Sequence, residues 1–394
     1  MISIDSQSST RSSDTTQDST DHPINICHVV GSIGHGGRES LLEEIIKESP
    51  EHLDYVVCGM RVRDGYEARF EQLGAETVSF QAESDRDLKA LLRMARFFYN
   101  RTFDIIHAHG PNAQIPSRLI SPVSGSSVIS TVHGVPSMFP EKLLRLERLT
   151  RPIDARTVAV SNGVKHAFIG DSASRQWQTI QNGIDVDAFQ RDVSASDTSS
   201  IEDQYRISED DFVYLNIGRY VPPKAQLDLI EATAVLVEDR SDVHLFIVGG
   251  RGAMEGRLRN RVEEYGLTDH ITVTGQVDDI HPFYARADVF VSSSVGEGLP
   301  IVQLEAMAAQ LPVIATDIPG VRELVVDGET GILVPPKSPA RLANAMLEIT
   351  NRDDLARFGG AGYDRVRESF HISNTVSDYV SLYHSLSQSQ GWIR

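Results

Sequence analysis

The sequence predicts an α/β protein built from two parallel, doubly wound sheets. From Ile24 onward, short apolar runs alternate with amphipathic segments, which is the pattern of strands and crossover helices. The alternation stops in a polar stretch, 191–211, and restarts at Phe212. Each half opens with a strand, a glycine turn and a helix, and 394 residues suffice for two cores. We therefore expect two Rossmann-like domains that face each other across a cleft lined by strand ends.

The first half contains six predicted strands separated by turns and helical segments. They cover residues 24–30, 55–58, 77–80, 105–109, 128–133 and 157–161. A glycine loop over 31–37 and a helix over 39–48 follow the first strand. Residues 1–22 are mostly Ser, Thr, Asp and Gln without Phe, Trp or Tyr, which predicts a disordered tail. The first domain is assigned to residues 23–190.

The second half repeats the rhythm after the polar stretch. Its strands are predicted at 212–218, 243–249, 271–275, 289–292, 313–316 and 331–334. The stretch 191–211 is rich in Ser, Asp, Thr and Glu, so we interpret it as an interdomain linker. The second domain is assigned to residues 212–370. Residues 371–394 are assigned to a C-terminal helix, which is most regular over 375–386.

Bulk properties exclude several classes of function. The formal net charge of −18 argues against nucleic-acid binding. Cys27 and Cys58 lie in apolar runs, which is typical of small buried hydrophobic residues in a reducing compartment. The sequence shows no signal-peptide pattern and no apolar run long enough to span a membrane. We therefore expect a cytoplasmic protein.

A basic helix over 141–151 has two interpretations. Its Lys and Arg side chains could contact an anionic membrane surface. Two glutamates and a short apolar stripe favour ordinary packing instead. Peripheral contact with the inner membrane face remains the alternative.

Two glutamates separated by eight positions are the most informative local feature. Glu297 follows an apolar run that ends at Ser294, and Glu305 lies about two turns into a predicted helix over 300–309. Helical geometry holds their carboxylates roughly 10–15 Å apart beside one helix N-terminus. That arrangement suits two contacts on one ligand with its phosphates between them.

Two cations follow the first strand of the second half. Arg219 and Lys224 flank a Pro-Pro turn, so both come to the mouth of that domain. Arg offers a planar fork and Lys a point charge, and a pyrophosphate is bound by such groups. The glycine loop over 31–37 lacks the spacing of a dinucleotide fingerprint. A ligand-free tight turn and contact with a phosphate or sugar remain its interpretations, and the second is favoured.

Three histidines lie at the ends of neighbouring strands. His107 and His109 share one strand face, which would permit a metal site, but no Asp, Glu or Cys accompanies them at ligand spacing. His133 precedes a glycine at a strand end. We interpret His133 as a hydrogen-bond donor in the cleft and predict no metal.

Taken together, these segments resemble the retaining GT-B glycosyltransferases of glycosyltransferase family 4 over about residues 24–370. The resemblance rests on an ordered set of motifs rather than on any single one. They are Gly-Gly-Arg-Glu39, His-Ala-His-Gly110, Thr-Val-His-Gly134, Val-Ser-Asn-Gly163, Gln-Asn-Gly-Ile-Asp185, Gly-Arg-Tyr-Val-Pro-Pro-Lys224, Val-Gly-Gly250, Gly-Gln-Val277, the paired glutamates and Ala-Thr-Asp-Ile-Pro-Gly320.

The resemblance implies a role for each candidate residue. The second domain would bind a nucleotide-diphosphate sugar, and the first would hold a glycan, lipid-linked or small-molecule acceptor. His133 and Glu297 would act at the reacting sugar, and no cofactor or metal is implied. The implied donor contacts are Arg219 and Lys224 on the diphosphate, Glu305 on the ribose, amides from Gly298 and Leu299 onward on phosphate and sugar, and Gly36 and Gly37 near the phosphates.

The chain departs from the family pattern in two places. Ala225 stands where glycine usually follows the lysine, and Val-Gly-Gly-Arg-Gly252 lacks the usual acidic residue. A GT-B nucleotide-sugar epimerase and a non-catalytic nucleotide-sugar-binding protein are the alternative functions. An oxidoreductase would need a dinucleotide fingerprint, which is not found.

Overall fold

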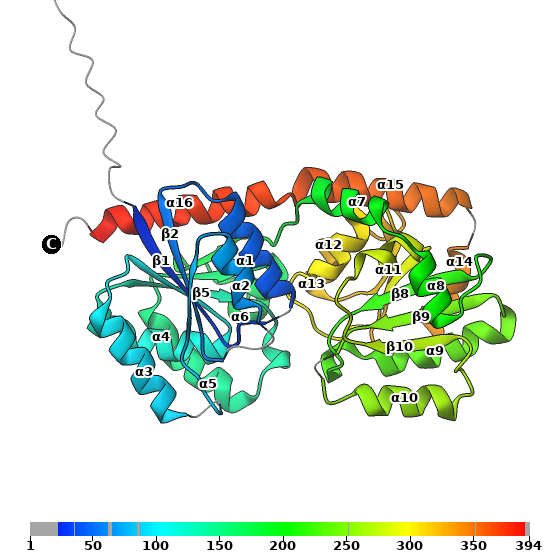
Figure 1. Ribbon diagram of the computed structural model, residues 1–394, viewed down its shortest axis with the longest axis horizontal. Coiled ribbons are helices and arrows are strands. Elements are labelled where there is room, and N and C mark those ends of the chain that lie inside the picture. Colours follow the sequence, from blue (N-terminus) through cyan, green and yellow to red (C-terminus); the bar gives the residue numbers. More distant parts are fainter. Residues whose placement is uncertain are drawn as a thin grey trace, which may run out of the picture.

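The computed structural model describes residues 23–34, 36–61, 65–84, 87–250, 252–350 and 352–390. Two all-parallel sheets lie side by side, one of seven strands in the order β3-β2-β1-β4-β5-β6-β7 and one of six in the order β10-β9-β8-β11-β12-β13 (Figure 1). The predicted α/β class with two Rossmann-like domains is confirmed. The tail predicted over 1–22 lies outside the described residues.

The N-terminal sheet forms from buried apolar runs, and its helices cover both faces. Its strands are β1 (Ile24–Val30), β2 (Leu53–Gly59), β3 (Glu76–Ser79), β4 (Ile105–His109), β5 (Ser127–Val132), β6 (Arg156–Ala159) and β7 (Trp177–Thr179). Its helices are α1 (Gly37–Glu48), α2 (Glu67–Gln72), α3 (Leu88–Asn100), α4 (Pro111–Ser124), α5 (Glu141–Thr150) and α6 (Asn162–Ile169), with short 3-10 turns η1 (Pro136–Met138) and η2 (Arg151–Ile153). All six predicted strands are present, and the three-residue β7 was not predicted.

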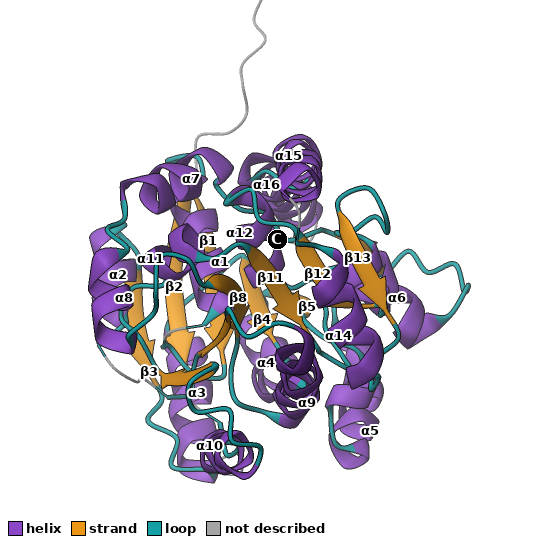
Figure 2. Cartoon of the chain, turned by 90° about the vertical axis from the view of Figure 1, so that its right-hand side faces the viewer, coloured by secondary structure: helices purple, strands orange, loops and turns teal. Residues whose placement is uncertain are grey.

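The C-terminal domain repeats the arrangement, with helices flanking its sheet in Figure 2. Its strands are β8 (Phe212–Ile217), β9 (Val243–Val248), β10 (Ile271–Gly275), β11 (Val289–Ser292), β12 (Val313–Thr316) and β13 (Gly331–Val334). Its helical segments are α7 (Val186–Ala195), α8 (Ser199–Tyr205), η3 (Pro222–Lys224), α9 (Gln226–Asp239), α10 (Glu255–Glu264), α11 (His281–Arg286), α12 (Ile301–Ala308), α13 (Pro319–Arg322), α14 (Pro339–Glu348) and α15 (Arg352–Ser369).

Much of the stretch interpreted as a linker is helical. It contains the second half of α7 and all of α8. The Asp185 side chain caps α7 by accepting a hydrogen bond from the Ala188 amide at 3.0 Å. Phe189 packs its ring edge against Tyr284, with centroids 5.2 Å apart. The helix that begins before residue 191 therefore packs on the C-terminal domain.

The last helix, α16 (Ile372–Gln390), returns to the N-terminal domain (Figure 1). It contributes Ile372, Val376 and Tyr379, among others, to the core around β1 and α1. Backbone hydrogen bonds join the two segments at which the chain passes from one domain to the other. The Ile184 amide donates to the Phe370 carbonyl at 3.0 Å, and the Ile372 amide donates to the Ile184 carbonyl at 2.9 Å.

One apolar core is continuous from one domain into the other. Val160, Val164 and Trp177 of the N-terminal domain belong to the same buried cluster as Leu299 and Leu304 of the C-terminal domain. Burial of this cluster removes apolar surface from water and stabilises the orientation of the two sheets seen in the structure. That orientation fixes the geometry of the cleft between them.

Candidate functional site

A cavity of about 460 Å³ lies between the two sheets. Four of the predicted site residues line it: Gly36 and Gly37 at the start of α1, Arg219 after β8, and Glu305 on α12. Strand ends 217–219 and 248–250 form its wall on the C-terminal side. The cavity therefore joins a glycine turn, an exposed cation and a carboxylate drawn from both domains.

Lys224 and Glu297 contact each other directly. The Lys224 ammonium lies 2.6 Å from Glu297 Oε1, and the Ser294 hydroxyl donates to the same oxygen at 2.7 Å. The Glu297 side chain is only 9% exposed, so the ion pair is largely shielded from water. Neither residue lines the cavity with Arg219. The structure thus places the two predicted diphosphate cations in different surroundings, one exposed and one already paired.

Ala225, the first departure from the family pattern, has a left-handed backbone conformation with φ 48° and ψ 36°. This conformation costs an L-residue about 1–2 kcal/mol, and glycine avoids most of it. We expect Ala225→Gly to raise the free energy of unfolding by about 0.5–1 kcal/mol, measured by denaturant titration. Ala356→Gly, at an exposed site in the right-handed helix α15, is the matched control and should lower it by a similar amount. A loss of stability in both variants would contradict the strain at residue 225.

Glu305 projects from α12 and is held by Tyr284. The Tyr284 hydroxyl donates to Glu305 Oε2 at 2.8 Å and also lies 3.1 Å from the Val302 carbonyl oxygen. Burial raises the pKa of Glu305 above its usual range, although the bond from Tyr284 opposes that shift. The carboxylate is therefore oriented before any ligand arrives.

The loop between the two glutamates packs against the N-terminal domain. The Ser161 hydroxyl donates to the Gly298 carbonyl at 2.9 Å, and the Asn182 side-chain amide donates to the Leu299 carbonyl at 3.0 Å. A Cβ atom added at Gly298 would lie 2.4 Å from the carbonyl oxygen of His133. Only glycine fits there, and this close approach brings the His133 and Glu297 segments together.

A chain of hydrogen-bonded histidine side chains extends inward from His133. His133 Nε2 lies 3.1 Å from His109 Nδ1, and His109 Nε2 lies 2.9 Å from His28 Nδ1. His28 and His109 are buried, whereas His133 retains partial exposure. One nitrogen of His133 is therefore occupied by the interior, and Nδ1 is the nitrogen left for a ligand in the cleft.

His107 belongs to a second set of hydrogen bonds that anchors α16. Its Nδ1 lies 2.8 Å from the Tyr383 hydroxyl, and its Nε2 lies 2.7 Å from the Thr131 hydroxyl. His28, His107 and His109 lie close enough to share a metal ion. Both ring nitrogens of His107 and of His109 have protein partners, whereas the buried Nε2 of His28 has no hydrogen-bond partner among the described residues.

Burial keeps these histidines neutral, which predicts acid sensitivity. It lowers the pKa of His28 and of His133 to about 3, and it lowers those of His107 and His109 well below the usual value. In the unfolded chain these histidines bind protons below a pH of about 6.5, whereas in the folded chain they stay neutral at that pH. The contribution of the neutral imidazoles to stability is therefore fully present above that pH and is lost as the solution is acidified, by about 2 kcal/mol at pH 5 for the fully buried His28.

The measurement is the free energy of unfolding between pH 7 and pH 5. His28→Asn should make its pH slope shallower by up to one proton. His166→Asn removes a side chain that is 66% exposed and should leave the slope unchanged. Equal slopes in all three proteins would contradict a neutral, buried His28.

Several contacts of the site have no clear signal in the sequence. Ser294 precedes Glu297 by three positions and could have been found as a neighbour of the turn. Tyr284 and His28 come from distant segments without a recognisable motif.

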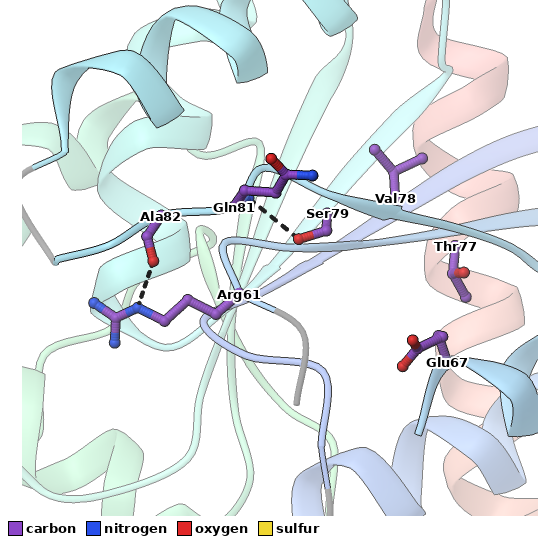
Figure 3. A pocket seen from close by; sticks show the side chains of 7 residues that line it. All are labelled: Arg61, Glu67, Thr77, Val78, Ser79, Gln81 and Ala82. Carbon is purple, nitrogen blue, oxygen red and sulfur yellow. Dashed lines mark hydrogen bonds between the residues drawn. The ribbon is translucent and has the colours of Figure 1, made fainter. Parts of the chain in front are cut away.

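A further cavity of about 590 Å³ lies beside β3, where Arg61 Nε donates to the Ala82 carbonyl at 3.0 Å; none of the predicted site residues lines it (Figure 3).

Comparison with known proteins identifies the family. The chain matches the family model of the group 1 glycosyl transferases over residues 197–365 and that of glycosyltransferase family 4 over residues 35–188. It is 31% identical over 319 residues to a phosphatidyl-myo-inositol mannosyltransferase of Mycobacterium leprae, which covers 75% of this chain and 77% of that protein. The chain belongs to glycosyltransferase family 4. It is therefore a glycosyltransferase, as the ordered motifs implied.

One further relative supports this assignment, and a solved structure supports the fold. The glycosyltransferase is 33% identical over 274 residues to a GDP-mannose-dependent alpha-(1-6)-phosphatidylinositol monomannoside mannosyltransferase of Mycobacterium tuberculosis, covering 64% of this chain and 69% of that protein. Its fold superposes with a TM-score of 0.81 on HepE of Anabaena, crystallised with UDP-glucose, at 22% identity and covering 92% and 100% of the two chains. The predicted GT-B architecture is thereby confirmed. Within the described part of this glycosyltransferase, none of the helices has the length and apolar character needed to cross a bilayer.

Proposed function

We propose that this glycosyltransferase moves a hexosyl group from a nucleotide-diphosphate sugar to an acceptor hydroxyl, with retention at the anomeric carbon. The observation that carries the proposal is the cavity between the sheets, which combines Arg219, Glu305 and the glycine turn at Gly36 and Gly37. A cation, a helix N-terminus and backbone amides are groups that bind a diphosphate, and a partly buried carboxylate suits ribose hydroxyls. The N-terminal domain would supply the acceptor side.

In this proposal Lys224 changes partner during the reaction. The Lys224 ammonium contacts the Glu297 carboxylate at 2.6 Å in the structure. An arriving diphosphate competes for the ammonium, which would free the Glu297 carboxylate for the donor sugar. Arg219, Lys224 and the α12 N-terminus would then stabilise the negative charge of the departing diphosphate.

His133 would act from the opposite side of the cleft. Its backbone carbonyl lies close to Gly298, which supports a place for its ring beside the proposed donor-sugar loop. A neutral imidazole tied to His109 through Nε2 can place Nδ1 against a sugar hydroxyl and align the reacting groups. Metal is not required in this scheme, because two cations and a helix dipole supply the positive charge.

The relatives indicate which donors should be tested first. Those named above use GDP-mannose or act on a phosphatidylinositol, and the structural neighbour was crystallised with UDP-glucose. A cytoplasmic location is part of the proposal. The thiols of Cys27 and Cys58 lie 3.4 Å apart and unlinked, which suits a reducing compartment.

The test is donor turnover with a panel of GDP-, UDP- and ADP-hexoses in the presence of EDTA. We expect one nucleotide class to be used, with activity retained in the chelator. Nuclear magnetic resonance of the transferred sugar should show the donor's anomeric configuration. A product with the opposite configuration would contradict retention. Loss of activity in EDTA that magnesium or manganese restores would contradict metal independence. Release of an altered nucleotide sugar without an acceptor would indicate the epimerase instead.

A further inference from the structure

Exposed apolar side chains gather on one side of the N-terminal domain. Ten large apolar residues of the described chain are strongly exposed, and eight of them lie on α3, α4, α5 or the adjoining η2. Only Val235 and Tyr265 lie elsewhere. The eight residues are Leu88, Leu92, Tyr99, Leu119, Val123, Leu146, Leu149 and Ile153.

The three helices form one continuous surface. α4 packs against α3 on one side and against α5 on the other. Figures 1 and 2 place all three at the lower edge of the N-terminal domain, away from α16. We call this surface, with the eight apolar residues just named and the basic residues Lys89, Arg96 and Lys142, the α3–α5 face.

The apolar residues of α3 form a second stripe that the fold does not use. Ala90, Met94 and Phe98 point into the core, whereas Leu88, Leu92 and Tyr99 follow helical spacing on a different side of the helix. Leu88 and Tyr99 are 73% and 74% exposed. An apolar stripe left in water adds nothing to folding, so it indicates a surface that is covered in use.

α5 reverses the usual orientation of apolar and charged residues. Glu147 is buried beneath it and pairs with Arg118 of α4 at 3.2 Å, while Leu149 is 76% exposed. Arg118 is itself completely buried and also pairs with Asp154 at 2.6 Å. This buried ion network fixes α5 on α4 with Leu146 and Leu149 facing outward, while Leu144 packs inward.

Positive charge accompanies the apolar residues. Within 88–101 of this acidic chain there are four basic residues and no acidic one. Lys89 and Arg96 lie on the turns next to Leu92, and Lys142 lies one turn before Leu146. Among the described residues, none of these three cations has an acidic partner within salt-bridge distance.

We propose that the α3–α5 face docks on an anionic lipid bilayer. Leucines and a tyrosine flanked by Lys and Arg are the composition of surfaces that lie in the membrane interface. A second copy of the chain is a poorer partner, because a symmetric contact would bring these cations against each other. η1 and α5 directly follow His133 in sequence, so docking would hold the acceptor side of the cleft near the bilayer. The last step rests on the proposed function: an acceptor side held near the bilayer favours an acceptor that is linked to a lipid.

The test is co-sedimentation of the full-length protein with vesicles. We expect binding to phosphatidylcholine vesicles that contain about a quarter phosphatidylglycerol, and much weaker binding to pure phosphatidylcholine. Leu92→Ser combined with Leu149→Ser should lower the partition coefficient at least about tenfold. Lys89→Glu with Arg96→Glu should abolish the preference for anionic vesicles. The matched control, Val235→Ser with Tyr265→Ser, removes exposed apolar side chains from the C-terminal domain and should change nothing.

Absence of vesicle binding by the unmodified protein, or equal binding by the leucine variant, would overturn docking. So would dimerisation in solution that the leucine variant abolishes, because the face would then serve a second copy. Turnover of soluble donor is measured on the same samples. Loss of vesicle binding with unchanged turnover supports docking, whereas vesicle binding without turnover of any donor counts only against the proposed transfer reaction.

Discussion

Glu297→Gln lowers kcat by roughly a hundredfold and leaves the donor KM nearly unchanged. A hundredfold loss corresponds to about 2.7 kcal/mol of stabilisation made only in the transition state. The carboxylate lies on the loop that approaches the His133 backbone, and the proposed reaction would change charge and ring shape at this place. Its oxygen is held by Lys224 and Ser294, and the amide of glutamine keeps the shape but not the charge.

Glu305→Gln is the matched variant and should fail differently. Its contact with the ribose would be equal in the ground and transition states, so the donor KM rises while kcat stays within a few-fold. Burial raises the pKa of Glu305, so the donor KM of the unmodified enzyme should rise on acidification at a higher pH than an ordinary glutamate would produce. Steady-state kinetics at several pH values check both statements. Reversed effects, or two variants near the unmodified enzyme, would refute the distinct roles of the glutamates.

Lys224→Ala weakens the binding of a nucleoside diphosphate by roughly 10- to 150-fold, which is about 1.5–3 kcal/mol for a charge-assisted bond. The loss also leaves Glu297 in a shielded position without its cation. Arg219→Ala should have a smaller effect in the same direction, because Arg219 is exposed to water. Affinity for the nucleoside without phosphates should not change in either variant.

Titration calorimetry with nucleoside and nucleoside diphosphate separates these outcomes. Arg257→Ala, an exposed cation on α10 outside the cavity, is the matched control. Unchanged diphosphate affinity in both the Lys224 and Arg219 variants would remove the basis for a diphosphate site at η3.

Strands such as β8, β9 and β11 could be predicted because they are buried on both faces and therefore appear as nearly continuous apolar runs. The predicted strands 289–292 and 331–334 coincide with β11 and β13. β7, Trp177–Thr179, escaped prediction because three residues with a polar pair give no periodic signal. The segment 191–211 was interpreted as a linker from its polar composition, yet side-chain capping and packing on α11 and α12 make α7 helical.

The residues of the candidate site also differ in whether the sequence could predict them. Residues that follow strands or open helices, such as Arg219 and Glu305, could be found because local sequence fixes their place. The pairing of Lys224 with Glu297 joins residues 73 positions apart, and that of His107 with Tyr383 spans 276. Such contacts depend on how the two sheets and α16 come together, which local patterns do not encode. The exposed side of α3 shows the same limit, since helical periodicity alone does not say which of two apolar stripes is buried.

The bridge between Ile184 and His371 has a mechanical consequence. The chain passes between the domains twice, and the two passages are joined to each other by backbone hydrogen bonds. Two chain segments joined in this way bend readily about the line that runs through both. They resist twisting and sliding, because either movement would stretch the hydrogen bonds of the bridge. We expect the domains to swing about that single axis, and distances between spin labels on the two domains should follow one arc. A spread of distances that one arc does not describe would contradict rotation about a single axis. If the domains rotate about one axis only, each closure of the cleft would bring the proposed acceptor and donor together at the same angle.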